Sequence, residues 1–206
     1  MALLSAILFA TIQACDSGSP AGLDDPVPTY GECNLTPNYI NEVDLNRWPS
    51  FPLRYYFDSA SFPTEFLADY RSSITDGIRR WHELAVDELG AIIEVNAQTD
   101  SDFLVVYREI TPTNSPARTF HSTGTPYLEG GEIVYNSTAM AQVEEMVRNG
   151  FSRDAFRRGL SSIAAHEMGH LMGIIGHPSR TDVLMGSSVF SQDGPTLSDM
   201  NTLIHA

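Results

Sequence analysis

The chain has 206 residues, and its 26 acidic and 12 basic side chains give a formal net charge of −14 at pH 7. So acidic a chain is not expected to bind nucleic acid, because contact with phosphates depends on a positive surface. About 160 residues follow the first 46, which suits one domain with a sizeable core and excludes a second domain of similar size.

An apolar run over residues 2–10 opens the chain and leads to Ile12-Gln13-Ala14-Cys15. The run is too short to span a bilayer as a stable helix, and a small residue precedes the expected cleavage point. The stretch resembles a bacterial lipoprotein signal, which implies a signal peptide over residues 1–14 and a lipid anchor at Cys15. The protein is then expected in the cell envelope, lipid-anchored or secreted, and at the membrane only through this anchor. An ordinary buried strand is the alternative.

Residues 15–46 are rich in Pro, Gly, Ser, Asp and Asn and show little periodicity, which predicts a flexible linker. The second cysteine of the chain, Cys33, lies within it. If Cys15 carries a lipid, Cys33 is a free thiol. If it does not, the two cysteines could form a disulfide in an oxidising compartment.

From Arg47 the composition becomes globular, so the folded domain is expected over residues 47–206. A strand is predicted at Leu53–Phe57. A long helix is predicted from about Pro63 to Leu89, because apolar residues recur along it at helical spacing. The expected core-facing residues of this helix are Phe66, Tyr70, Ile74, Ile78 and Trp81.

The rest of the domain alternates between short strands and helices. Runs of β-branched and aromatic residues predict strands at Ile92–Val95, Phe103–Tyr107 and Glu132–Asn136. Helical patterns predict helices at Thr138–Arg148, Ser152–Met172 and Ser198–His205. The residue expected to cap the last helix is Ser198.

The chemistry of the chain is concentrated in one stretch, 166–177. His166 and His170 are four residues apart on a predicted helix, so both imidazoles can reach one metal ion from the same helical face. Glu167 lies about 100° further round, where it can act as a general base without being a ligand. Gly173 can end the helix and turn the chain back, which brings His177 toward the same ion. Three protein ligands and an open position are typical of a catalytic zinc site.

The five-residue match alone is only moderately specific, since it would occur by chance in roughly one sequence of this length in a hundred. The alternative is a helix with core histidines. Support comes from the apolar residues that precede the motif at helical spacing, which are Phe156, Leu160, Ile163 and Ala164. The other histidines, His82, His121 and His205, have no second ligand at metal spacing and are expected to be structural.

The residues of this stretch resemble those of the metzincin zinc metalloproteases, and within them the matrixin-like branch. The family motif HExxHxxGxxH and its later Met-turn are matched in order by His166, Glu167, His170, Gly173, His177 and Met185. This sequence has one residue more between the glycine and the third histidine than the family spacing. The resemblance implies an α+β zincin domain with a twisted mixed sheet, a long N-terminal helix, an active-site helix and a C-terminal helix.

The resemblance also implies a zinc-dependent endopeptidase that acts as a monomer on peptides or proteins, with Glu167 as the base. Family members bind substrate along an edge strand, and this role is expected for Glu132–Asn136. The expected substrate-binding residues are Ile133, Val134 and Tyr135 on that strand and Gly186 and Ser187 after the Met-turn. A structural calcium ion is a further suggestion, at Asp100 and Asp102.

Two other functions are open on the sequence. One is a non-catalytic, zinc-containing envelope lipoprotein that serves as a binding module, which leaves Glu167 without a role. The other is a zincin of another clan, with Asp182 as the third ligand. A zincin with a downstream glutamate ligand is excluded, because no glutamate follows Glu167.

Overall fold

The computed structural model describes residues 38–111, 114–124, 127–186 and 194–204. The predicted signal peptide, the predicted anchor at Cys15 and most of the predicted linker lie outside these ranges. None of the helices within them is long and apolar enough to cross a membrane.

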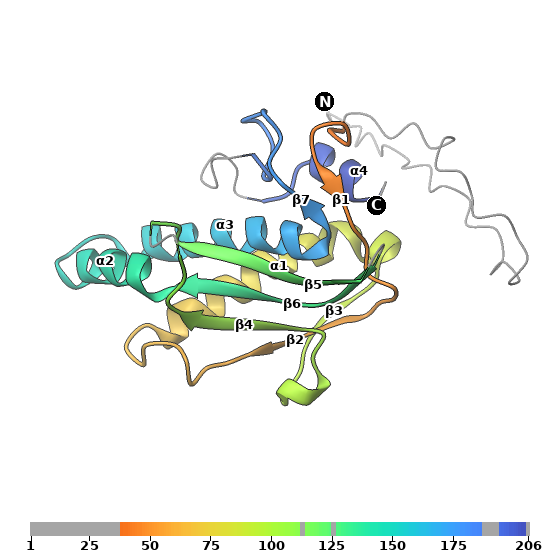
Figure 1. Cartoon of the computed structure of the whole chain (residues 1–206). Coiled ribbons are helices and arrows are strands. Elements are labelled where there is room, and N and C mark those ends of the chain that lie inside the picture. The colour runs from red at the N-terminus through yellow and green to blue at the C-terminus, as the bar shows by residue number, and fades with distance from the viewer. Residues whose placement is uncertain (1–37, 112–113, 125–126, 187–193, 205–206) are drawn as a thin grey trace, which may run out of the picture. The chain divides into compact units, whose positions relative to one another are not determined.

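The described chain has an α+β fold, as predicted, built on a mixed five-stranded sheet (Figure 1). The strand order is β3-β2-β4-β6-β5, and only the pairing of β5 with β6 is antiparallel. The strands are β2 Leu53–Phe57, β3 Ile92–Glu94, β4 Phe103–Arg108, β5 Ala117–Gly124 and β6 Tyr127–Asn136. A 3₁₀ turn, η1 Gln98–Asp100, precedes β4.

Two long helices, α1 Leu67–Leu89 and α3 Arg153–Met172, pack against each other beside the sheet (Figure 1). All five apolar residues predicted to face the core from the first helix are buried. Gly77 permits the close approach, because a Cβ there would lie 2.5 Å from the carbonyl oxygen of Ser161. The indole of Trp81 donates a 2.6 Å hydrogen bond to the Ala165 carbonyl. The helix that carries the HExxH motif is therefore fixed along its buried side.

A buried carboxylate adds a polar link between the same two helices. Asp69 of α1 accepts hydrogen bonds from Arg157 at 2.6 Å and from Arg153 at 2.8 Å, both on α3. Burial alone would raise the pKa of Asp69, but the hydrogen bonds from the two guanidinium groups outweigh it and hold the pKa below its ordinary value. The ionised form of Asp69 is the one that stabilises the helix pair.

The short helices are α2 Ser137–Arg148 and α4 Leu197–Ile204. The prediction that Ser198 caps α4 is wrong, because Ser198 lies inside the helix. Thr196 makes the cap instead: its hydroxyl accepts from the backbone N–H of Asp199, and the Asp199 carboxylate accepts from the backbone N–H of Thr196 at 2.7 Å. This reciprocal pair is a capping box.

The predicted start of the domain at Arg47 is too late. Among the described residues, the compact unit already begins at residue 38, and Tyr39 is buried in its core. A short strand, β1 Asp44–Leu45, pairs antiparallel with β7 Ile174–Ile175, just after the motif helix. Residues 38–46 therefore belong to the fold and not to the linker.

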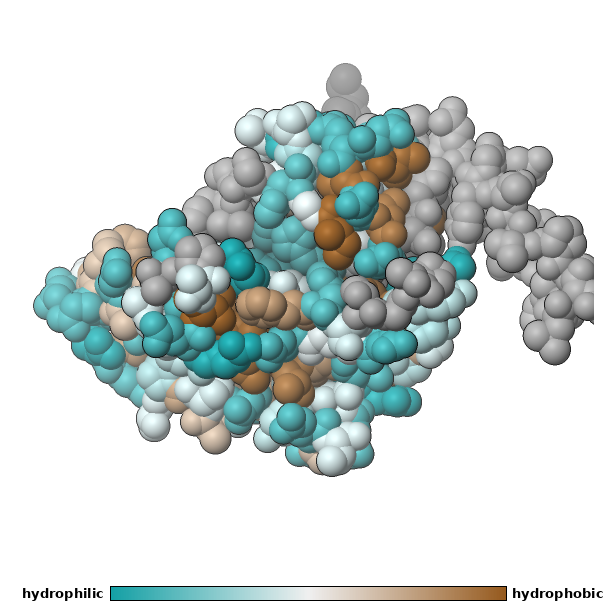
Figure 2. All heavy atoms as spheres, viewed as in Figure 1, coloured by the Kyte–Doolittle hydropathy of each residue, from teal (hydrophilic) through white to brown (hydrophobic). Residues whose placement is uncertain are grey.

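The face of the molecule seen in Figure 2 is mainly hydrophilic, and its hydrophobic side chains form separate small patches. This surface agrees with the high content of acidic residues. The apolar side chains of the core are enclosed between the sheet, α1 and α3.

Candidate metal centre

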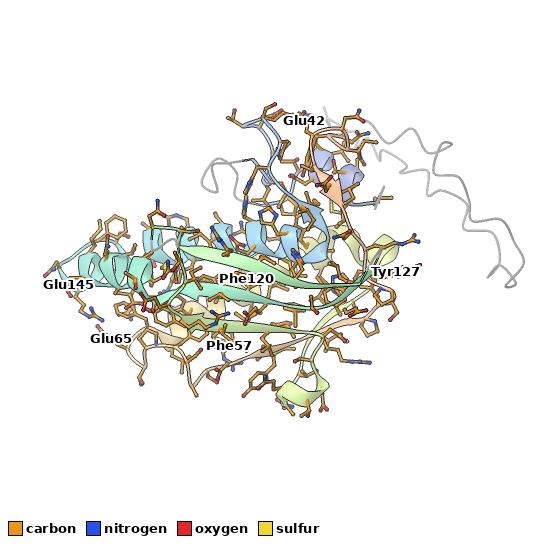
Figure 3. The ribbon with its side chains drawn as sticks, in the orientation of Figure 1. Glu42, Phe57, Glu65, Phe120, Tyr127 and Glu145 are labelled. Carbon is orange, nitrogen blue, oxygen red and sulfur yellow. The ribbon has the colours of Figure 1, made fainter. Side chains whose placement is uncertain are left out.

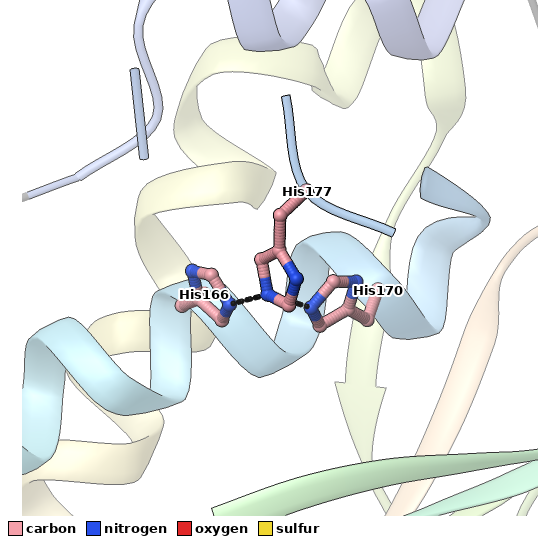
Figure 4. A group of neighbouring side chains, drawn as sticks. All are labelled: His166, His170 and His177. Carbon is pink, nitrogen blue, oxygen red and sulfur yellow. Dashed lines mark hydrogen bonds between the residues drawn. The ribbon is translucent and has the colours of Figure 1, made fainter. Parts of the chain in front are cut away.

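Three histidines converge at the C-terminal half of α3. His166 and His170 come from successive turns of the helix, and His177 comes from the segment after β7 (Figure 4). The Nε2 atom of His177 lies 3.1 Å from Nε2 of His166 and 3.2 Å from Nε2 of His170. Nitrogen ligands of a tetrahedral zinc ion, each about 2.0–2.1 Å from the metal, are about 3.3 Å apart. The cluster can therefore hold a metal ion.

Hydrogen bonds to the backbone fix which ring nitrogen faces the centre of the cluster. Nδ1 of His166 lies 2.8 Å from the Leu184 carbonyl oxygen, and Nδ1 of His170 lies 2.7 Å from that of Ile174. A carbonyl can only accept, so each Nδ1 carries the ring proton and each Nε2 presents a lone pair. Outer-shell carbonyls orient metal-binding histidines in this way.

The electrostatics also favour a cation at this point. Burial lowers the pKa of His166 to about 4 and that of His170 to about 3, and it lowers the pKa of His177 as well. The rings are therefore neutral at neutral pH. The single Nε2 proton that a neutral His177 can carry would satisfy one neighbouring lone pair and leave the other without a donor. A cation placed among the three nitrogens would instead accept a lone pair from each of them.

The return of the chain after α3 depends on two glycines. Gly173 ends the helix with a φ of 125°, and a Cβ there would lie 1.9 Å from the carbonyl oxygen of Asn46. Gly176 has a φ of 93° and directly precedes His177, so it accommodates the additional residue of the motif. Asp182, the competing ligand, lies outside the cluster and forms an exposed pair with Arg180 at 2.8 Å.

Glu167 is buried beside the cluster, at the side of β5. The Thr119 hydroxyl lies 2.8 Å from Oε2 of Glu167 and 2.9 Å from its backbone carbonyl oxygen, and it can donate to one of them at a time. Burial raises the pKa of Glu167 to about 7, although the hydrogen bond from Thr119 acts in the opposite direction. A carboxyl group with such a pKa exchanges protons readily near neutral pH.

Met185 packs against the motif helix at Gly169. Its side chain is buried, and a Cβ on Gly169 would lie 2.3 Å from its sulfur. The backbone N–H groups of Leu184 and Met185 donate to the carboxylate of Asp199 at 3.0 and 3.2 Å. Asp199 thus fixes the loop whose Leu184 carbonyl orients His166.

A cleft of about 520 Å³ opens above the histidines and Glu167. One side of it is formed by residues 115–119 and His121, at the edge of the sheet. The sequence did not reveal this strand, β5, nor the part played by Thr119. His121, which was expected to be structural, has Nε2 2.8 Å from the His170 carbonyl oxygen and so links the edge strand to the motif helix.

The prediction that the Glu132–Asn136 strand is an edge strand that binds substrate is wrong. This strand is part of β6, which lies between β4 and β5 and is not an edge. Ile133, Val134 and Tyr135 are fully buried. Gly186 is also buried, and Ser187 lies outside the described residues.

In the part of the chain that the structure describes, no third His, Cys, Asp or Glu side chain joins the two aspartates suggested as a calcium site. There, Asp100 and Asp102 belong to no group of three metal-ligand side chains. Asp102 instead accepts a hydrogen bond from the backbone N–H of Arg54 at 2.6 Å.

A scan against protein-family models finds no match for the chain, and a search of curated proteins finds none either.

Proposed function

We propose that the protein is a zinc-dependent endopeptidase. The observation that supports this most strongly is the convergence of three imidazole Nε2 atoms on one point, with a buried carboxylate beside them and a cleft above. Imidazole is a good ligand for zinc, and three protein ligands with an open side are the pattern of catalytic zinc sites. A zinc ion bound there would polarise a carbonyl group and make water a better nucleophile.

The residues of the chain supply the proton transfers. Glu167 is next to His166 in sequence but points its carboxylate toward Thr119 and the cleft. It can accept the proton of the attacking water and pass it to the amine that leaves. The resulting reaction class is hydrolysis of a peptide bond, and Glu167 is the catalytic residue in it.

The edge of β5 offers a place for the substrate main chain. The backbone N–H of Asn136 donates to the Pro116 carbonyl at 2.9 Å, so Pro116 and every second residue after it bond to β6. The intervening residues, Ala117, Thr119 and His121, turn their backbone N–H and C=O groups away from β6. No described strand pairs with that edge. An extended peptide can add there as a further strand and lie across the cleft.

The test is the Glu167→Gln variant, compared with the unchanged protein on a broad peptide library. We expect zinc content to be retained and turnover to fall by several orders of magnitude, because the carboxylate is a base and not a ligand. A chelator should abolish the activity of the unchanged protein. Full activity of the variant would refute the mechanism, and a wild-type protein that binds zinc but cleaves no peptide would favour the binding-module function.

A further inference from the structure

Residues 38–46, here called the N-terminal strap, lie beside β7, the strand between α3 and His177 (Figure 3). Its composition predicts part of a flexible linker. In the structure it contacts the domain at three separate points. Each contact fixes a group or a loop that positions a different histidine of the cluster.

The first contact is a strand pairing. Leu45 of β1 pairs with Ile174 of β7, and the backbone N–H of Asn46 donates to the Gly173 carbonyl at 2.9 Å. Ile174 is the residue whose carbonyl oxygen lies 2.7 Å from Nδ1 of His170. The strap therefore holds the group that orients the second histidine.

The second contact is made by Glu42. One oxygen of its carboxylate accepts hydrogen bonds from the backbone N–H and the hydroxyl of Ser179, both at 2.8 Å. Ser179 follows His177 by two residues, in a loop that is mostly exposed. This contact ties the loop of the third histidine to the strap.

The third contact reaches His166 through Asp199. The Tyr39 hydroxyl donates to the Asp199 carboxylate at 2.6 Å, and the backbone N–H of Tyr39 donates to the Thr202 hydroxyl at 3.0 Å. The same carboxylate holds the N–H of Leu184, whose carbonyl oxygen lies 2.8 Å from Nδ1 of His166.

We propose that the N-terminal strap is a positioning element of the metal centre, which keeps all three histidines in the arrangement that binds the ion. The inference rests on the cluster being the metal centre of the proposed function, but it does not depend on the reaction catalysed there. Glu42 is the residue that separates positioning from folding. It is exposed, so its loss removes no apolar contact from the core and acts on the loop of His177.

The experiment measures metal binding by the full chain carrying Glu42→Ala. Zinc affinity is obtained by competition with a chromophoric chelator, and Co²⁺ absorption reports the geometry of the ligands. We expect zinc binding to weaken about tenfold, as for loss of outer-shell partners in other metal sites, together with a changed Co²⁺ spectrum. The metal-free variant should melt at the temperature of the metal-free unchanged protein.

Two matched variants make the result specific. Glu42→Gln keeps an oxygen that can accept from Ser179, and it should restore zinc affinity to within about twofold of the unchanged protein. Glu145→Ala removes a carboxylate from α2 that is also exposed and pairs with Arg148 at 3.1 Å, and it should leave zinc affinity unchanged.

The proposal is overturned if Glu42→Ala binds zinc as tightly as Glu145→Ala. It is also overturned if Glu42→Gln binds as weakly as the alanine variant, or if the weakening only follows a lower melting temperature of the metal-free protein. An unchanged protein that binds neither Zn²⁺ nor Co²⁺ would refute the metal centre itself, and with it the proposed function. A peptidase assay without cleavage leaves the affinity comparison intact, so the two proposals fail separately.

Discussion

His166 and His170 belong to a helix that is buried along most of its length, whereas His177 belongs to a loop whose residues are mostly exposed. The helix is held by close packing against α1 and by the link from Asp69 to the arginines of α3. The loop around His177 is held instead by the hydrogen bonds from Ser179 to Glu42, a strap residue more than 130 positions away in the sequence. We call these the helical half and the loop half of the proposed metal centre.

Because the two halves are held differently, different perturbations should change folding and metal binding. The helical half shares its contacts with the core, so damage there lowers the free energy of unfolding of the whole domain. The loop half has few core contacts of its own, so damage there should move ligands while most of the domain stays folded.

Loss of the ligand in the loop half should have the largest effect on zinc affinity. His177→Ala removes one of three nitrogens and is expected to weaken zinc binding by about a thousandfold or more, since loss of an outer-shell partner alone costs about 10–100-fold. Asp182→Ala should leave the affinity unchanged, because Asp182 pairs with Arg180 outside the cluster. Zinc competition titrations of the two variants measure this. Loss of the metal in the aspartate variant alone would show that Asp182 is the third ligand.

A substitution at Gly173, where the two halves meet, is expected to affect both folding and metal binding. Gly173→Ala places a Cβ at a φ of 125° and 1.9 Å from the Asn46 carbonyl oxygen, so the strap or the helix end must move. We expect the free energy of unfolding to fall by about 3 kcal/mol or more, with weaker zinc binding. Denaturant unfolding of the metal-free protein measures the first effect.

Gly150→Ala is the matched control for this junction. Gly150 also has a positive φ, of 99°, but a Cβ there meets nothing within 4 Å. Only the backbone strain of about 1–2 kcal/mol is expected, with zinc affinity unchanged. Equal losses of stability in the two glycine variants would mean that the Cβ added at Gly173 does not clash with the strap.

The sequence predicted the helical half well because its information is local. Four-residue spacing places His166 and His170 on one face, and the apolar residues before them specify the buried side of the helix. The other helices were predicted from the same kind of periodicity, whereas the α+β class was implied by the family resemblance. These predictions needed no knowledge of distant contacts.

The loop half and the edge strand depend on pairings between distant residues, which periodicity does not reveal. The sequence of β5, Ala117–Gly124, is largely polar and shows little of the apolar alternation typical of a strand, so the sequence pattern gives no sign that this strand, and not β6, is the edge. Tyr39 and Glu42 lie in a segment whose composition is typical of a linker, and their partners are more than 130 residues away. Ser198 and Thr196 are both good capping residues, and the hydrogen bonds of Asp199 decide between them.

A smaller effect than that of Gly173→Ala is expected from a change that lies wholly in the helical half, and it should be confined to stability. Asp69→Asn removes the charge that Arg153 and Arg157 bind, and we expect a loss of about 2 kcal/mol at pH 7, typical of hydrogen bonds to charged groups. The folded-state pKa of Asp69 lies below its ordinary value of 3.8. Its stabilising contribution is therefore present above the unfolded-state pKa of about 3.9 and is lost as the pH falls through the lower folded-state pKa.

Urea unfolding of the metal-free proteins between pH 7 and pH 2 measures this contribution. The difference between Asp69→Asn and the unchanged protein should stay constant down to about pH 5 and shrink below about pH 4. Zinc affinity at pH 7 should be the same for both proteins, because Asp69 touches no residue of the loop half. A weakened zinc site in this variant would contradict the division of the metal centre into two halves, since damage to the helix pair would then reach the ligands directly.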